Sequence, residues 1–163
     1  MRWLPEPVER LLEAALVGEL TVVGPDRRPI THPLIPLYLD GRIYLHSSTL
    51  FSRKLEHIKR DPRVSLAISD PVATRGNPDR ATIQGTARLI EDDPHTDWER
   101  LILDLWRRKE PVIDEFLKAR VALPLFFERS VIEITPERCL YWPGGRTDRE
   151  PVEARAPHGR VAA

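Results

Sequence analysis

Hydroxyl and cationic side chains gather at residues 47–54, where the sequence reads SSTLFSRK. Arg53 and Lys54 stand in the first turn of a predicted helix, and that end of a helix already carries partial positive charge. Two cations are unfavourable there unless they face an anion, and free backbone N–H groups at a helix start bind phosphate well. We therefore interpret this segment as an anion site, with phosphate as the favoured ligand. A solvated basic helix start is the alternative.

Other residues offer little of the common catalytic chemistry. Cys139 is the only cysteine, so an internal disulfide and a cysteine-rich zinc site are both excluded. The sequence has no glycine-rich phosphate loop or nucleophile elbow, and no pair of carboxylates stands out for acid–base work. His32, His46 and His57 fall on separate predicted elements and form no metal-ligand pattern. We expect no metal site, leave the catalytic residues unassigned and interpret His57 as solvated.

Length and charge restrict the class of protein. The chain has 163 residues, which suits one domain with a real core. Its 25 Lys and Arg residues balance 25 Asp and Glu residues, so there is no basic excess for a nucleic-acid partner. No apolar run is long enough to span a membrane, and the first residues do not resemble a signal peptide. We expect a cytoplasmic protein.

Short extended segments and tight turns surround the anion site. Asp40-Gly41 between two apolar runs predicts a hairpin, and Phe51, Leu55 and Ile58 share one face of the helix after the serines. Strand patterns cover residues 20–23, 30–39, 43–45, 64–68, 81–89, 131–134 and 139–142, with a turn at 136–138 before the last. Helical patterns cover 8–16, 53–60 and 112–117, and a further helix begins at Asp93-Pro94.

This order of elements predicts a mainly β protein. The helices do not alternate regularly with the strands, which argues against a doubly wound parallel sheet. Short antiparallel strands with inserted helices favour a small barrel. We expect one domain over residues 1–143 and a flexible tail over 144–163, which is rich in Gly, Pro and Arg.

The motif and its position resemble the flavin-binding split-barrel superfamily of pyridoxine/pyridoxamine 5'-phosphate oxidase. The matching segments are GPDRRP (24–29), HPL (32–34), DGRIYL (40–45), SRK (52–54), DPRVSL (61–66) and IQGTA (83–87). The resemblance implies an antiparallel split barrel that forms a homodimer, with FMN in a groove at the subunit interface. It also implies that the cofactor carries out the redox chemistry.

The resemblance further implies a set of cofactor-binding residues. Arg53 and Lys54 would bind the FMN phosphate, and the strand from His32 to Ile35 would lie along the isoalloxazine ring. Gln84 falls near the family's flavin-contacting glutamine. Arg138 and Trp142 would cover the ring from the partner subunit. The complete set is His32, Pro33, Leu34, Ile35, Ser47, Ser48, Arg53, Lys54, Gln84, Arg138 and Trp142.

Two departures separate this chain from pyridoxine/pyridoxamine 5'-phosphate oxidase itself, the vitamin oxidase of the superfamily. The Arg-x-His-Asp substrate motif of those oxidases is absent, and His32 and Leu37 stand where they place a cofactor-side arginine and lysine. We therefore expect an FMN-dependent oxidoreductase that acts on an unidentified small organic substrate. One alternative is a deazaflavin-dependent reductase of the same fold. Another is a non-catalytic flavin- or haem-binding protein, with haem the less favoured ligand.

Overall fold

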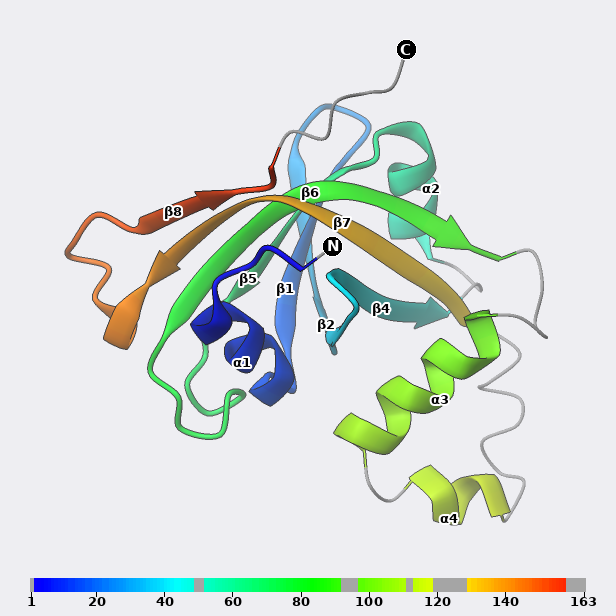
Figure 1. Ribbon diagram of the computed structural model, residues 1–163. Helices are drawn as coiled ribbons and strands as arrows, with labels where there is room; N and C mark the ends of the chain where they lie inside the picture. Colours follow the sequence, from blue (N-terminus) through cyan, green and yellow to red (C-terminus); the bar gives the residue numbers. More distant parts are fainter. Residues whose placement is uncertain (1, 49–51, 92–96, 111–112, 119–128, 158–163) are drawn as a thin grey trace.

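A single curled antiparallel sheet dominates the computed structural model, which describes residues 2–48, 52–91, 97–110, 113–118 and 129–157 (Figure 1). The strands are β1 (Gly18–Val23), β2 (Pro29–Leu34), β3 (Leu37–Leu39), β4 (Arg42–Ser48), β5 (Arg63–Ile68), β6 (Arg80–Ile90), β7 (Arg129–Trp142) and β8 (Val152–Arg155). The 8-stranded sheet runs in the order β2-β1-β5-β6-β7-β4-β3, and β8 pairs with β7. The half-barrel shape confirms the predicted fold class.

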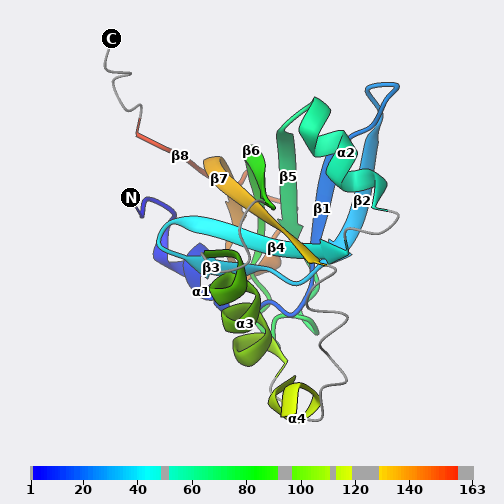
Figure 2. The ribbon, with the colours of Figure 1, turned by 90° about the vertical axis from the view of Figure 1, so that its right-hand side faces the viewer.

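Helices cover the two ends of the half-barrel. They are α1 (Glu6–Ala14), α2 (Arg53–Arg60), α3 (Asp97–Lys109) and α4 (Ile113–Lys118), with a 3-10 turn η1 at Pro143–Gly145. Figure 2 shows α2 beside β1 and β2 at one end, with α3 and α4 at the other. None of the described helices is both long and apolar enough to cross a membrane. The predicted helix start at Asp93-Pro94 and the side chain of Phe51 lie outside the described residues.

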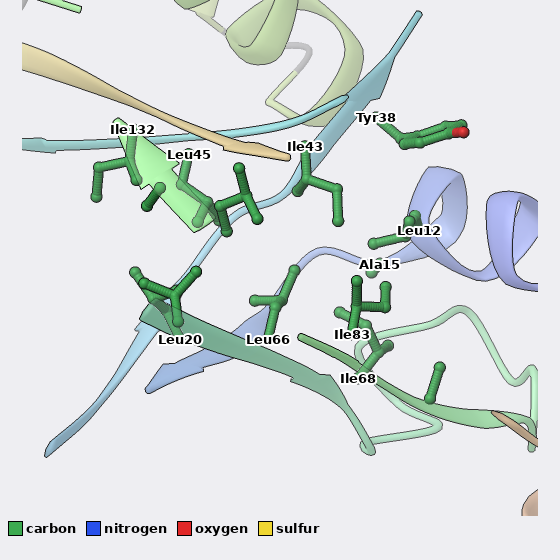
Figure 3. Close-up of a cluster of buried hydrophobic side chains, with 14 of the residues drawn as sticks. Leu12, Ala15, Leu20, Tyr38, Ile43, Leu45, Leu66, Ile68, Ile83 and Ile132 are labelled. Atoms are coloured by element: carbon green, nitrogen blue, oxygen red, sulfur yellow. The ribbon is translucent and has the colours of Figure 1, made fainter. Parts of the chain in front are cut away.

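The core lies on the inner face of the sheet, where alternate strand residues point. Leu20, Leu66 and Ile83 come from neighbouring strands and are fully buried, and Leu12 reaches them from α1 (Figure 3). Leu55 and Ile58 bring α2 against the same cluster. A second, smaller cluster lies between α3 and the outer face of the sheet near β4; it contains Leu37, Leu101, Ile102, Leu105, Trp106, Ile113 and Val131.

The hairpin predicted at Asp40-Gly41 is confirmed. Both residues have positive φ angles, 51° and 81°, as a tight turn of this kind requires. The turn joins β3 to β4, which therefore lie side by side and antiparallel. Strand β4 in turn delivers Ser47 and Ser48 to the beginning of α2, so the hairpin sets the register of the serine pair.

The prediction of two final strands joined by a turn at 136–138 is wrong. Strand β7 is continuous, and the pairing with β6 shifts where Gln84 lies opposite Arg138 and Gly85 opposite Pro136. Glu137 is therefore the extra residue of a β-bulge. The bulge brings the two backbones close together: a Cβ atom on Gly85 would clash with the Thr135 carbonyl oxygen. Proline and charge suggested a turn, but a bulge accommodates both within a strand.

Two other predicted boundaries differ from the structure. The extended segment expected over 30–39 divides into β2 and β3, because Pro36 between them lacks the N–H group that a ladder needs. The segment expected as a flexible tail contains β8, whose residues Val152–Arg155 pair with the end of β7. Residues 158–163 of that segment lie outside the described residues.

Candidate functional site

A cluster of hydroxyl and amino groups joins the end of β4 to the beginning of α2. The Lys54 Nζ atom donates a 2.8 Å hydrogen bond to Ser47 Oγ and a 3.3 Å bond to Ser52 Oγ. The two serine hydroxyls lie 3.1 Å apart. Ser52 is the N-cap residue of α2, yet its side chain makes no capping hydrogen bond. Its hydroxyl therefore faces the Lys54 side of the cluster instead of serving the helix.

Two cations of this cluster, Arg53 and Lys54, stand at the beginning of α2. Within the described ranges, neither Arg53 nor Lys54 forms an ion pair with a carboxylate. Burial lowers the pKa of Lys54, and the positive charge of Arg129 lowers it further. Arg129 begins β7 and lies opposite Ser48 of β4 in the ladder. Lys54 has no carboxylate partner among the described residues, and an anionic ligand stabilises a cation in that position.

Two histidines border Lys54. Burial lowers the pKa of His32, and the nearby Lys54 and His57 lower it further. The His32 Nε2 and His57 Nδ1 atoms are both shielded from solvent, and neither has a hydrogen-bond partner among the described residues. His57, which we expected to be solvated, is half-buried with one ring nitrogen enclosed. These nitrogens add two unused hydrogen-bonding atoms to the cluster.

The structure gathers only part of the predicted residue set. Ser47, Lys54 and His32 come together, while Arg53 is exposed beside them and Ser48 pairs with Arg129 at the strand end. The other residues of the 32–35 strand turn elsewhere: Pro33 is exposed, Leu34 packs against the main core and Ile35 against the second cluster. Of this segment, only His32 has a pKa that the charge of Lys54 is shown to affect.

Gln84, Arg138 and Trp142 lie on the outer face of the sheet. Arg138 donates a 3.4 Å hydrogen bond to Gln84 Oε1 and holds the two oxygens of Glu153 at 3.0 Å each. Trp142 is the last residue of β7, and it alternates with the core residue Tyr141. Ser47 and His32 lie by contrast on the inner face with the core residues. One chain therefore separates these two groups of predicted residues.

Two adjoining surface pockets follow the outer face. A pocket of about 460 Å³ is lined by Gln84, Glu137, Arg138, Arg155, Ala156 and Pro157. A second pocket of about 410 Å³ continues it across β5 and β1 and shares Gln84 and Glu137 with the first. Arg155 also donates to Glu153, so one carboxylate is shared by two guanidinium groups here. The groove is therefore polar, and it carries charges of both signs because Glu137 also lines it.

His46 does not belong to either group of residues. It follows Leu45 on β4 but points outward, where the Trp106 Nε1–H group of α3 donates a 2.9 Å hydrogen bond to its Nε2 atom. The two rings meet edge to face, with centroids 5.7 Å apart. Burial lowers the pKa of His46 to about 4, so the ring is neutral. His46 therefore connects the sheet to α3.

Sequence reasoning missed Arg129 and His57. Arg129 follows residues 119–128 and begins a strand that was expected only from residue 131, so no motif marked it. His57 could have been found from its spacing, because residue i+3 of a helix lies on the same face as Lys54. The partners that make both residues relevant come from other elements of the sheet.

The half-barrel sheet thus carries hydroxyl and cationic groups beside the first turn of the short helix α2. The family model of pyridoxamine 5'-phosphate oxidase matches residues 4–143, and the chain belongs to this family. No curated protein matches the sequence. The chain is thus a relative of the vitamin oxidase within the superfamily and not the vitamin oxidase itself, as predicted.

Solved structures share the fold at low sequence identity. A conserved hypothetical protein from Mycobacterium tuberculosis is 23% identical with a TM-score of 0.70, over 98% of this chain and 95% of that one. A protein described as an F420 reductase is 22% identical with a TM-score of 0.59, over 83% and 98%. A putative pyridoxamine 5'-phosphate oxidase from Listeria innocua is 22% identical with a TM-score of 0.59, over 83% and 95%. At these identities the likeness establishes the fold alone.

Proposed function

We propose that this chain is a cytoplasmic FMN-dependent oxidoreductase acting on a small organic substrate. The observation that carries the proposal is Lys54, a partly buried cation that is bonded to two serine hydroxyls and has no carboxylate among the described residues. An ammonium in that setting is stabilised by an anionic ligand. Family membership makes the phosphate of a flavin cofactor the best candidate for that anion.

The residues of the cluster fit a phosphate monoester. Lys54 supplies a compact charge, and the exposed Arg53 guanidinium beside it can present a planar fork to two phosphate oxygens. Ser47 and Ser52 supply hydroxyl donors once a phosphate replaces the hydrogen bonds they share with Lys54. Each charge-assisted hydrogen bond contributes roughly 1.5–3 kcal/mol. FMN, when bound, supplies the redox chemistry, and this chain supplies binding and orientation.

The proposed site is completed by a second copy of the chain. Gln84, Arg138 and Trp142 lie on the outer face of the sheet, away from Ser47 and His32 on the inner face. One flavin can meet both groups if the outer face of one subunit packs beside the cluster of the other. We therefore propose a homodimer with the cofactor at the subunit interface. The backbone of His32–Ile35 would lie along the ring edge.

The phosphate site is tested by comparing FMN with riboflavin, which differs from FMN only by lacking the phosphate. We expect wild-type protein to bind FMN far more tightly than riboflavin in a fluorescence titration. Replacement of both Arg53 and Lys54 by Ala should remove most of that difference and leave the fold intact. Arg60→Ala, an exposed cation in the last turn of the same helix, serves as the control. If the double variant binds FMN as tightly as the wild type does, the assignment of the phosphate site is wrong.

A deazaflavin-dependent reductase is the second candidate. The observation in its favour is the F420 reductase whose structure shares the fold over 83% of this chain. Titrating the apoprotein with both cofactors under one set of conditions distinguishes the two candidates. Tighter binding of the deazaflavin would replace FMN in the proposal, whereas binding of either without turnover of any electron donor would favour a carrier or sensor.

A further inference from the structure

His32 and His57 each have one buried ring nitrogen that forms no hydrogen bond within the described part of the chain. The His32 Nε2 and His57 Nδ1 atoms are shielded from solvent. A buried polar atom without a hydrogen bond costs roughly 1–3 kcal/mol, so such atoms are rare and call for a ligand or water. The two residues come from different elements, β2 and α2, and both border Lys54. A ligand bound at Lys54 is therefore within the reach of both elements.

The described residues whose charges act on the pKa of His32 are both basic. From α2, Lys54 and His57 act on it, and Arg129 of β7 acts in turn on Lys54. Strand β4 contributes Ser47 to the cluster, which carries no charge. On β1, the residue opposite His32 is Leu20. Among the described residues that act on the pKa of His32, none is negatively charged, so its surroundings favour the neutral ring.

Resting on the function proposed above, we propose that the His32–His57 pair binds the cofactor phosphate and takes up a proton as it binds. A phosphate dianion beside the two rings reverses the local field and favours the imidazolium form. Neutral histidines would each donate one hydrogen bond, while a protonated ring donates from both nitrogens. The pair thereby matches a second negative charge that Lys54 alone leaves uncompensated.

This proposal gives the dependence of affinity on pH a definite sign. The second pKa of a phosphate monoester is about 6, so FMN is a dianion above roughly pH 7. From about pH 8.5 down to pH 7, protonation of the histidines becomes easier while the ligand charge stays constant. Complete uptake of one proton tightens binding up to about tenfold per pH unit. We expect the dissociation constant for FMN to fall at least about threefold over this range.

The uptake is measured directly by calorimetry of FMN binding at about pH 7.5 in two buffers of different ionisation enthalpy. We expect the wild-type protein to take up a substantial fraction of a proton per FMN, and riboflavin to produce none. The double variant His32→Gln with His57→Asn keeps an amide nitrogen near each ring nitrogen but cannot titrate. It should still bind FMN, with the uptake lost. Ser47→Ala should weaken FMN binding at every pH and keep the uptake.

Three results have distinct consequences. Wild-type binding of FMN without proton uptake overturns the inference, and this holds even if the double variant fails to fold. Uptake that persists in a folded double variant, or that riboflavin reproduces, also overturns it. Failure of FMN to bind at any pH would instead refute the function proposed for the site, so the two hypotheses are tested separately.

Discussion

Trp106 holds His46 in one tautomer. The indole Nε1–H group can only donate, so the 2.9 Å bond to His46 Nε2 leaves the ring proton on Nδ1. Trp106 is itself buried in the cluster between α3 and the sheet. The bond therefore links the outer face of β4 to the helical layer, one residue away from the serine that contacts Lys54.

Trp106→Phe should lower the stability of the protein by about 1–3 kcal/mol, because it preserves most of the ring packing but leaves His46 Nε2 without a donor. The free energy of unfolding in urea, at pH 7, measures this loss. His46→Gln is the complementary change, since the glutamine amide oxygen can accept the same bond. A phenylalanine variant as stable as wild type would show that the hydrogen bond contributes nothing to stability.

Acid should weaken the wild-type protein more than the His46→Gln variant. The folded state lowers the pKa of His46 from 6.5 to about 4, through burial first and then Arg129. The contribution to stability is therefore complete above pH 6.5 and lost as the pH falls through 4, by roughly 1.4 kcal/mol per pH unit. Urea unfolding at several pH values between 7 and 4 tests it. Parallel curves for the two proteins would contradict the prediction.

Lys109 should affect the stability of the protein at alkaline pH, whereas His46 affects it at acid pH. Its side chain is 7% exposed, and its Nζ atom donates to the carbonyl oxygens of Leu12, Glu13 and Ala15 at 3.0, 2.6 and 2.8 Å. These groups end α1, whose own last turn contains no basic residue. Lys109→Met should therefore cost about 2 kcal/mol or more at pH 7, since it leaves several carbonyls unpaired.

The gap between wild type and Lys109→Met should widen above pH 8. Burial lowers the pKa of Lys109 from 10.5 to about 8, so the folded state holds fewer protons than the unfolded chain between these values. Its contribution is complete above pH 10.5 and diminishes as the pH falls to 8. Subtracting the Met variant cancels the tyrosines, which also titrate in alkali. A gap that narrows between pH 8 and 9.5 would refute this assignment.

Gly85→Ala should be among the most damaging single changes in the chain. The added methyl group would clash with the Thr135 carbonyl oxygen across the bulge, and backbone atoms cannot move aside cheaply. We expect a loss of about 3 kcal/mol or more. Gly76→Ala is the control, because that glycine has a φ of +85° but nothing within 4 Å of the added atom. It should cost only about 1–2 kcal/mol, as measured by thermal or urea unfolding.

Local signals predicted much of this structure because they depend on neighbours in sequence. The helix from Arg53 to Arg60 was bounded by a serine before it and Asp61-Pro62 after it, and the structure ends it at the same residues. The predicted alternation of side chains between the two faces of β6 is likewise present in the structure, where buried residues alternate with more exposed ones. The continuity of β7 was missed because it depends on Gly85 in another strand. The same is true of Arg129, which gains its relevance from pairing with Ser48.

The bulge at Glu137 also determines which side of the sheet each residue of β7 faces. Ile134 and Cys139 both point into the core although they are five positions apart, an odd interval that a regular strand would place on opposite sides. The bulge accommodates the single additional residue, so the residues before and after it keep the same face of the strand toward the core. A regular strand that kept Glu137 but had no bulge would turn Cys139 and Tyr141 to the surface and bury Arg138. The same bulge therefore determines both which residues of β7 pack in the core and which line the outer groove, so a change in one must alter the other.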